Sequence, residues 1–520
     1  MVNGSPNKCG FLWVLLPCAV VLILAAWLRG AEYDEQYTLF LTAGVPRPDW
    51  PMTVFPAGLA RDIQAGHSAP VAIARDLRTT DVHPPLYFWL AALWRDAFGP
   101  GLFVARLLSV TLGLGALALT GAIARLARIP PVWAMLLTLG CYGFTYTSVI
   151  ARGFSLAQLL LLGGVAGLLL GRRFWHLASA GALLGGATMS NYLSAFVAGA
   201  CLLAAGVDWA RSPRRPRLQA DPGDLSPHRP DDNLPRTSRL ALAALFGFLV
   251  FIPADLWWFL AQRGTRPGQF PPFSLGPNLA RLMARFAGNL LGGLPLYVGG
   301  AASSAVTVVL CLLLVWLVAR IAWRWRHIGT QRARLMFALG ALAPATGLLV
   351  LGAIFNNTPI EVRYLTFSSP FVALLLASAL GARGIAVVLT VQAASITGLM
   401  LAPQTMQPAR AAARLAAAWV EDGVVLLPRG NDGVGVVGAF AIEAPPTLPL
   451  LLIPAGETPE QIRTRIGTWH RVVLAQLEQD GASRQASEAM RQALNNAMWR
   501  EVAHGPNVAV YERTDCDGCS

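Results

Sequence analysis

The sequence has little charge for its length. Only 13% of its 520 residues are charged, whereas 55% are hydrophobic, and the mean hydropathy is +0.50. A soluble globular chain carries about 25% charged residues, so the composition excludes a soluble globule of this size. The composition instead predicts a protein that is embedded in a lipid bilayer.

Lysine is nearly absent. Lys8 is the single lysine among 41 Lys and Arg residues. The formal net charge of +13 would suit a nucleic acid, but the arginines stand in short tracts between apolar segments, as in a protein of the inner membrane. We therefore expect no nucleic-acid partner. Any bound anion must be met by arginine, histidine or helix ends.

The sequence also lacks a solenoid repeat, a GxGxxG stretch, a P-loop and a zinc signature. Five of the seven cysteines stand in or beside apolar stretches, where a cysteine usually behaves as a small hydrophobe. Cys516 and Cys519 form one isolated CxxC in the last five residues. A plain terminal tail explains this pair best, and a disulfide or half of a metal site are the alternatives.

The first apolar run, Phe11 to Leu28, predicts an uncleaved helix with its N-terminus inside, since no small-residue cleavage site follows it. The next loop, 30–101, is then outside. It contains one ambiguous apolar stretch, Pro84 to Phe98, which is shorter than the roughly 20 residues that a bilayer requires. An interfacial position for this stretch is favoured, because it leaves the later arginine pairs Arg125/Arg128 and Arg172/Arg173 inside.

The hydropathy pattern predicts about eleven membrane spans. They are expected near residues 11–28, 102–124, 131–150, 154–171, 174–190, 192–207, 240–261, 302–322, 335–355, 363–381 and 385–402. The arginine- and proline-rich segment 208–239 is typical of a disordered cytoplasmic linker. An odd number of spans places 403–520 outside, where strand-like and helix-like stretches alternate. We therefore expect an all-α polytopic membrane domain, 1–402, followed by a small extracytoplasmic α/β domain, 403–520.

Two acids follow the first helix, in the stretch YDEQYT. Asp34 and Glu35 stand close to a membrane interface, where carboxylates are costly unless they are solvated or used. When the motif is taken alone, a functional role and ordinary solvated acids at an outer helix end explain the two residues about equally well.

The same outer loop contains DVHPPLYFWL. Pro84 and Pro85 predict a helix start and leave His83 at its N-terminal edge, a place that favours an anion. A proline-initiated amphipathic helix with His83 as a polar cap is the alternative. The occurrence of both motifs on one loop is a stronger indication than either motif.

Three arginines fall at or near the outer face: Arg106 in FVARLLS, Arg152 in VIARGFS and Arg363 in EVRYLTF. A single arginine at a helix end usually only reaches towards lipid headgroups. Together with the acids and His83, however, these arginines suit a general base that works beside a bound phosphate.

These motifs resemble GT-C glycosyltransferases of the protein O-mannosyltransferase and aminoarabinose-transferase type, which use polyprenyl-phosphate sugars. The resemblance rests on YDEQYT, HPPLYFWL, ARLLSVTLG, ARGFSLAQLLLL and VRYLTFSSPFVALLLA, in this order over much of residues 10–400. It implies a membrane glycosyltransferase in which Asp34 is the general base on an acceptor hydroxyl and Glu35 stands beside it.

The resemblance also implies a phosphate site. His83 and Arg106 would contact the lipid phosphate, and Arg152, Arg363 and Tyr364 match further recurrent positions. The implied reaction is displacement at the anomeric carbon with inversion, in which preorganised cations stabilise the leaving phosphate. No cofactor is required and no metal ligand is assigned, although a divalent metal is compatible with the site.

Two departures from the family leave the acceptor open. The chain lacks a central lumenal domain, since the outer segment 263–301 is short, and it has Val82 and His83 where the aminoarabinose type has Glu-Lys before the prolines. The expected partners are a polyprenyl-phosphate-sugar donor, membrane lipids and an outer glycan, lipid or protein acceptor, at a bacterial inner membrane. The alternatives are a lipid-linked glycan flippase, for which related halves or interrupted helices are missing from the sequence, and a non-catalytic scaffold.

Overall fold

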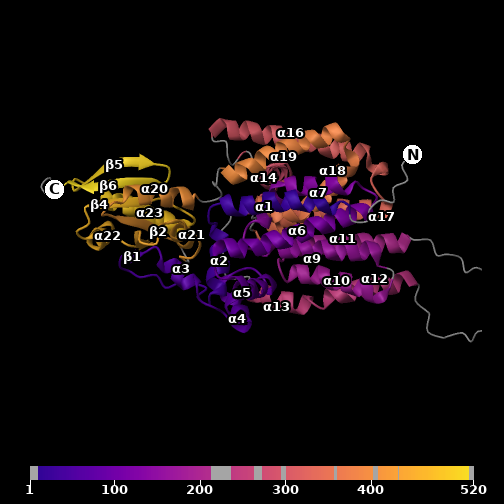
Figure 1. Ribbon diagram of the computed structural model, residues 1–520, viewed down its shortest axis with the longest axis horizontal. Helices are drawn as coiled ribbons and strands as arrows, with labels where there is room; N and C mark the ends of the chain where they lie inside the picture. Colours follow the sequence, from indigo (N-terminus) through magenta and orange to yellow (C-terminus); the bar gives the residue numbers. More distant parts are fainter. Residues whose placement is uncertain are drawn as a thin grey trace, which may run out of the picture.

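The computed structural model describes residues 10–171, 173–211, 236–262, 272–293, 295, 300–356, 360–401, 408–430 and 433–514. They form a helical bundle and, at one end of it, a unit built mainly from residues 408–514, here called the C-terminal unit (Figure 1). Cys516, Cys519 and most of the predicted linker 208–239 lie outside the described residues.

Helices make up the bundle and the outer loop. In chain order they are η1 (Leu12–Val14), α1 (Leu15–Leu28), α2 (Tyr33–Thr42), α3 (Leu59–Gln64), α4 (Pro70–Thr80), α5 (Leu86–Phe98), α6 (Leu102–Leu126), α7 (Pro131–Gly140), α8 (Tyr142–Ser148), α9 (Phe154–Leu170), α10 (Phe174–Thr188), α11 (Ser194–Arg211), α12 (Arg236–Leu249), α13 (Ile252–Gln262), α14 (Leu275–Leu291), α16 (Gly300–Trp323), η2 (Trp325–His327), α17 (Gln331–Phe355), η3 (Val362–Ser368), α18 (Ser369–Ala379) and α19 (Ala382–Leu401).

Six helical segments of the described chain are long and apolar enough to cross a bilayer. They are α6, Ala241–Gln262, α16, α17, Val362–Ala379 and α19. The number becomes seven when the pair of α1 with α2 counts as one span. The chain is therefore a multi-pass membrane protein, but the predicted number of about eleven spans is not confirmed.

The difference arises from helices that are shorter than predicted. The predicted span 131–150 is broken at Cys141 into α7 and α8, and α10 has 15 residues. At about 1.5 Å per residue, the 15 residues of α10 cover roughly 23 Å, which is less than the roughly 30 Å of a hydrocarbon core. The hydropathy pattern reports how apolar the residues are, and it does not show where a helix breaks.

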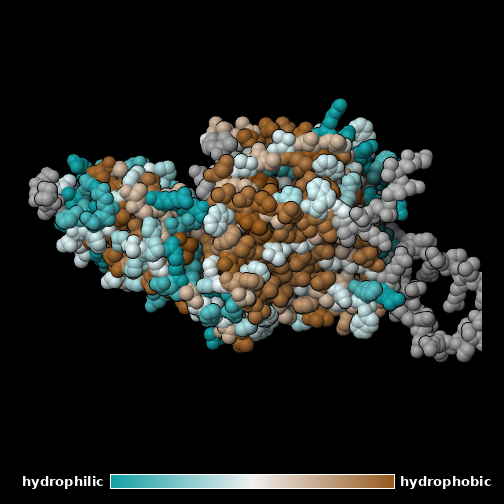
Figure 2. Space-filling view, in the orientation of Figure 1, coloured by the Kyte–Doolittle hydropathy of each residue, from teal (hydrophilic) through white to brown (hydrophobic). Residues whose placement is uncertain are grey.

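The bundle carries an apolar surface between two more polar ends (Figure 2). On α16 the side chains of Val308, Val309, Leu312 and Val315 are more than half exposed, although all are apolar. Such a surface is costly in water and suits contact with lipid. The C-terminal unit has many more hydrophilic residues on the same view of the molecule.

The C-terminal unit is a six-stranded sheet with helices on both faces. Its elements are β1 (Phe55–Pro56), α20 (Ala409–Trp419), β2 (Val424–Arg429), α21 (Gly435–Glu443), β3 (Pro449–Pro454), α22 (Pro459–Ile466), β4 (Arg471–Ala475), α23 (Gly481–Leu494), β5 (Trp499–Gly505) and β6 (Val508–Arg513). The strand order is β1-β3-β2-β4-β6-β5, and β2 runs parallel to both of its neighbours. The central strands are buried on both faces, which explains their continuous apolar runs such as VVLL.

The sheet draws one strand from the outer loop. Phe55 and Pro56 pair antiparallel with Leu450 and Pro449, and Ala57 donates its N–H to the carbonyl of Leu448 at 2.9 Å. The loop that follows α2, which the sequence predicts to be outside, is therefore built into the C-terminal unit. The domain boundary near 402 stays a prediction, and the sheet uses residues from both sides of it.

The predicted interfacial stretch appears as α5. It has 13 residues and packs against α2 and α6. Its buried face includes Tyr87, Phe88 and Ala91, whereas Leu93 and Phe98 are exposed. At roughly 20 Å, α5 is too short to cross a bilayer.

The ends of the predicted linker lie far from the C-terminal unit. Helix α11 ends at Arg211 and α12 begins at Arg236, both at the end of the bundle that is opposite to the C-terminal unit (Figure 1). That the linker and the C-terminal unit lie on different sides of the membrane stays a prediction. Which side is cytoplasmic stays a prediction.

Candidate functional site

The first corner of the chain is a right-angled turn between α1 and α2. Helix α1 ends at Leu28, α2 begins at Tyr33, and the two axes differ by 88°. Asp34 and Glu35 occupy the second and third positions of α2, where the positive end of the helix dipole stabilises carboxylates. Adjacent helical residues point about 100° apart, so the two acids face different neighbours.

Glu35 faces the interior and is completely buried. Arg106 on α6 donates to both of its carboxylate oxygens, from Nε at 2.7 Å and from Nη2 at 2.6 Å. The backbone N–H groups of Glu32 and Ala151 donate to the same carboxylate at 2.9 and 3.0 Å. Glu35 therefore ties α2 to α6 and to the segment that precedes α9 through charge-assisted bonds.

Arg106 binds the main chain of the corner in addition to the carboxylate of Glu35. Its Nη1 donates to the carbonyls of Ala26 at 2.9 Å and Arg29 at 2.8 Å, and its Nη2 donates to Gly30 at 2.6 Å. The carbonyls at a helix C-terminus have no partner within the helix, and here an arginine caps them. All five N–H groups of Arg106 are thus used inside the protein.

Asp34 faces η3, where it forms an ion pair with Arg363 from Nη1 to Oδ2. The side chain of Asp34 is 11% exposed and that of Arg363 is 13% exposed, so the pair is largely buried but still reaches the surface. Among the described residues, Nε of Arg363 has no hydrogen-bond partner. A buried donor without a partner is unfavourable, so an anion at this place would be stabilised.

His83 belongs to a second charged cluster, with Asp81 and Arg152. Arg152 donates from Nη1 to Asp81 Oδ2 at 2.8 Å, and Nδ1 of His83 lies 3.0 Å from Asp81 Oδ1 and 3.3 Å from Arg152 Nη2. Burial lowers the pKa of His83 below its ordinary value of 6.5, and the charge of Arg152 lowers it further, while Asp81 opposes both. The imidazole is therefore neutral at pH 7.

Helix α2 connects the two clusters. The charge of Asp34 acts on the pKa of His83, raising it slightly against the larger effects of burial and Arg152. The guanidinium carbon of Arg152 lies 5.7 Å from the centre of the Tyr37 ring, one turn after Asp34. The structure thus brings Asp34, His83, Arg152 and Arg363 to one region around the first turns of α2.

Tyr364 lies beside Arg363. The guanidinium carbon of Arg363 is 5.2 Å from the centre of the Tyr364 ring, a distance at which a cation and an aromatic face attract. Tyr364 therefore supports the position of Arg363.

Sequence reasoning missed a third group beside Asp34. Arg29 is completely buried, pairs with Glu32 and places its guanidinium carbon 4.3 Å from the centre of the Tyr146 ring. Asp81, which carries the second cluster, was also missed. The signal was present, because Arg29 and Glu32 stand in RGAEYDEQY and Asp81 stands two residues before His83. Spacing alone could not say which of these charges would pair.

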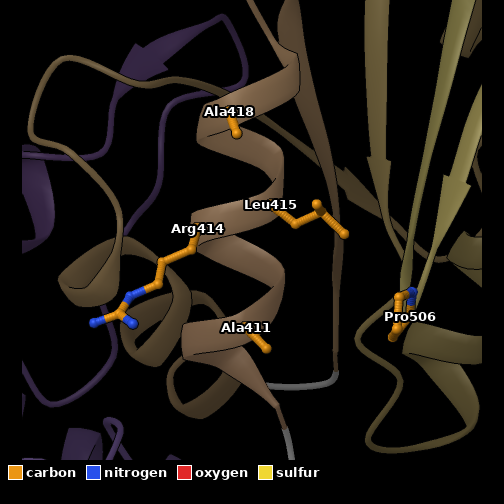
Figure 3. A pocket seen from close by; sticks show the side chains of 5 residues that line it. All are labelled: Ala411, Arg414, Leu415, Ala418 and Pro506. Atoms are coloured by element: carbon orange, nitrogen blue, oxygen red, sulfur yellow. The ribbon is translucent and has the colours of Figure 1, made fainter.

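No metal site is found at these clusters in the part of the chain that the structure describes. Within the described part of the chain, no three His, Cys, Asp or Glu side chains are grouped closely enough to hold a metal ion. An open cavity of about 340 Å³ lies on α20 of the C-terminal unit, where Arg414 points away from the other lining residues (Figure 3). The predicted site residues do not line this cavity, whose lining is Ala411, Arg414, Leu415, Ala418 and Pro506.

Sequence comparison finds no family model and no curated protein that matches the chain. Solved structures do match it. ArnT from Cupriavidus metallidurans bound to undecaprenyl phosphate superposes on 97% of this chain and 98% of its own, at 14% identity and a TM-score of 0.50. Its apo state covers 96% and 97% at 12% identity, with a TM-score of 0.40. The apo oligosaccharyltransferase of Archaeoglobus fulgidus covers 90% and 70% at 13% identity, with a TM-score of 0.41.

The match with undecaprenyl-phosphate-bound ArnT shows the fold of this chain. ArnT is an aminoarabinose transferase and a GT-C glycosyltransferase. The chain therefore has the fold of a GT-C glycosyltransferase along nearly its whole length. The resemblance that the motifs predicted is confirmed at the level of the fold.

Proposed function

We propose that the chain is a membrane glycosyltransferase that moves a sugar from a polyprenyl-phosphate donor to an acceptor on the outer side of the membrane, with Asp34 as general base. The observation that carries the proposal is the ion pair between Asp34 and Arg363 at the first outer corner of a GT-C fold. The undecaprenyl phosphate bound to ArnT supports a polyprenyl-phosphate donor.

The proposed reaction is one displacement. The acceptor hydroxyl oxygen attacks the anomeric carbon, and the bond from that carbon to the phosphate oxygen breaks, with its electron pair going to the lipid phosphate. The hydroxyl proton passes to the carboxylate of Asp34, a transfer that typically contributes about 10²- to 10⁴-fold in rate. Attack opposite to the leaving group inverts the anomeric configuration. The neighbouring Arg363 stabilises the carboxylate until the proton arrives.

The leaving phosphate requires cations that are already in place. We assign the positive charge to Arg363, whose Nε is without a partner among the described residues. The neutral imidazole of His83, just before α5, is assigned a hydrogen bond to the phosphate. Arg152 supports His83 through Asp81, and Tyr364 supports Arg363.

Glu35 and Arg106 receive a different role in the proposal. Their bonds are internal to the protein, and both side chains are almost completely buried. We propose that they fix the conformation of the corner that presents Asp34, and that they do not contact the substrate.

The location follows from the same proposal. The chain lies in a bacterial inner membrane with the N-terminus inside, and the acids, His83 and the C-terminal unit lie outside. The acceptor is a glycan, a lipid or a protein on that side, and the transferred group is a hexosyl or pentosyl sugar.

The test measures transfer of radiolabelled sugar from polyprenyl-phosphate donors, in membranes that carry equal amounts of wild-type protein, Asp34→Asn or Asp62→Asn. Asp62 is an exposed acid on the same outer loop and serves as the matched control. We expect Asp34→Asn to lower the rate by about 10²-fold or more and Asp62→Asn to leave it unchanged. Undiminished transfer by Asp34→Asn would exclude Asp34 as the base, and movement of an intact lipid-linked glycan without sugar transfer would favour a flippase.

A further inference from the structure

The corner between α1 and α2 is also held by the far end of the chain. Arg410 on α20 forms an ion pair with Glu443 at the end of α21, with Nε 2.7 Å from Oε2. Their side chains are 19% and 10% exposed, so the pair is sheltered between the C-terminal unit and the bundle.

The remaining donors and acceptor of this pair reach the main chain of the corner. Arg410 donates from Nη1 to the carbonyl of Leu28 at 2.6 Å and from Nη2 to the carbonyl of Arg29 at 2.9 Å. Glu443 accepts the N–H of Ala31 at its Oε1, at 2.6 Å. These bonds fix the path of the chain in the few residues that separate α1 from α2.

The carbonyl of Arg29 joins this clamp to the interior of the site. It accepts from Arg410 at 2.9 Å and from Arg106 at 2.8 Å. Arg106 in turn holds Glu35, the residue next to Asp34. One arginine from the bundle and one from the C-terminal unit therefore meet at the same peptide group, a few residues before Asp34.

Helix α21 also packs directly on α2 (Figure 1). A Cβ atom on Gly435 would stand 1.9 Å from the ring of Tyr33, and one on Gly438 would stand 2.8 Å from the ring of Phe40. The two helices come this close because both positions lack a side chain. The end of α21 that carries Glu443 is thus held at a fixed place relative to α2.

We propose that Arg410 and Glu443 are positioning residues for Asp34. They hold the main chain of the corner so that the first turn of α2 presents Asp34 to Arg363 and to the acceptor hydroxyl. This inference rests on the proposed function, because Asp34 is the proposed base. It gives the C-terminal unit a part in catalysis without contact to substrate, since a shift of about 1 Å at a reacting group can cost about 10²-fold in rate.

The test compares kcat and the KM for the donor in full-length Arg410→Ala, Glu443→Ala and a matched control, Arg465→Ala. Arg465 also lies in an ion pair of the C-terminal unit, with Glu457 at 2.5 Å, and donates to the carbonyl of Met52 in the outer loop. The side chains of this pair are 18% and 14% exposed, close to those of the clamp. Arg465→Ala therefore removes a similar interaction at a place away from the corner.

We expect Arg410→Ala and Glu443→Ala to lower kcat by about 10- to 100-fold with the KM unchanged, and Arg465→Ala to change neither. Should Glu443→Ala fail to fold, Glu443→Gln keeps the shape and one acceptor oxygen, and a fall in kcat is still expected. A wild-type kcat in Arg410→Ala, or an equal fall in Arg465→Ala, would overturn the inference.

A second measurement does not depend on activity. Hydrogen–deuterium exchange of residues 29–36 reports directly on the corner, since the N–H of Ala31 is bonded to Glu443. We expect faster exchange in this segment in Arg410→Ala and Glu443→Ala, and wild-type exchange in Arg465→Ala. Unchanged exchange in all three variants would overturn the positioning role. Failure of the wild-type protein to transfer any sugar would instead count against the proposed function alone.

Discussion

Asp34 and Arg363 form an ion pair across 329 positions of sequence. The acid stands in the first turn of α2, and the arginine stands in η3, just before α18. The pair joins the first outer loop to the last part of the bundle. It also places the proposed base next to the cation that we assign to the leaving phosphate.

Replacement of Arg363 should affect the reaction more than the fold. We expect Arg363→Gln to lower the rate of sugar transfer by about 10²- to 10³-fold, because a preorganised cation beside the developing charge is lost. The measurement is the initial rate at saturating donor, in membranes with matched protein levels. Arg383→Gln, which changes an exposed arginine at the start of α19, is the control and should keep the wild-type rate. Equal rates in the two variants would remove Arg363 from the site.

Replacement of Glu35 should affect the fold first. Glu35→Ala leaves Arg106 buried without its carboxylate, and the loss of one partner of a buried ion pair typically costs about 3–5 kcal/mol. We expect a clear fall in the thermal unfolding temperature of the purified protein in detergent. Glu460→Ala, which removes an exposed acid paired with Arg463, should leave that temperature unchanged. A normal unfolding temperature with lost activity would instead make Glu35 a catalytic residue.

His83 should make stability depend on pH in the acidic range. Its pKa in the folded protein lies below the ordinary value of 6.5, because of burial first and Arg152 second. As the pH falls below 6.5, the unfolded chain binds a proton at this position and the folded chain does not, so stability is lost. We expect the unfolding temperature of the wild type to fall more steeply below pH 6.5 than that of His83→Gln. The control is His327→Gln, at an exposed histidine, which should keep the pH dependence of the wild type. An unfolding temperature of His83→Gln that falls with pH as steeply as that of the wild type would contradict the prediction.

The proposed topology can be read from cysteine labelling. Asp96→Cys, at the exposed end of α5, should react with an impermeant maleimide in intact cells, whereas His327→Cys in the tract after α16 should react only after permeabilisation. Both variants are made in a chain whose native cysteines are replaced by serine. Labelling of His327→Cys from outside would reverse the orientation.

The corner between α1 and α2 shows how far the sequence could be interpreted. The end of the first apolar run and the YDEQYT motif correctly placed two acids directly after the first helix. Which acid faces the site depends on the direction of α2 relative to α6 and η3. That direction is set by Arg106, Arg363 and the C-terminal unit, which are distant in sequence.

The sequence by itself determined that the chain is a multi-pass membrane protein, that α5 is too short to cross, and which motifs gather around the first outer loop. Composition and local periodicity carry that information, because they depend on the solvent that each residue meets. Only the tertiary structure showed that Glu35 pairs with Arg106 and Asp34 with Arg363, and that a strand from the loop after α2 joins the C-terminal sheet. Those choices depend on which distant groups satisfy each buried charge and each carbonyl at a helix end, and residue spacing does not encode them.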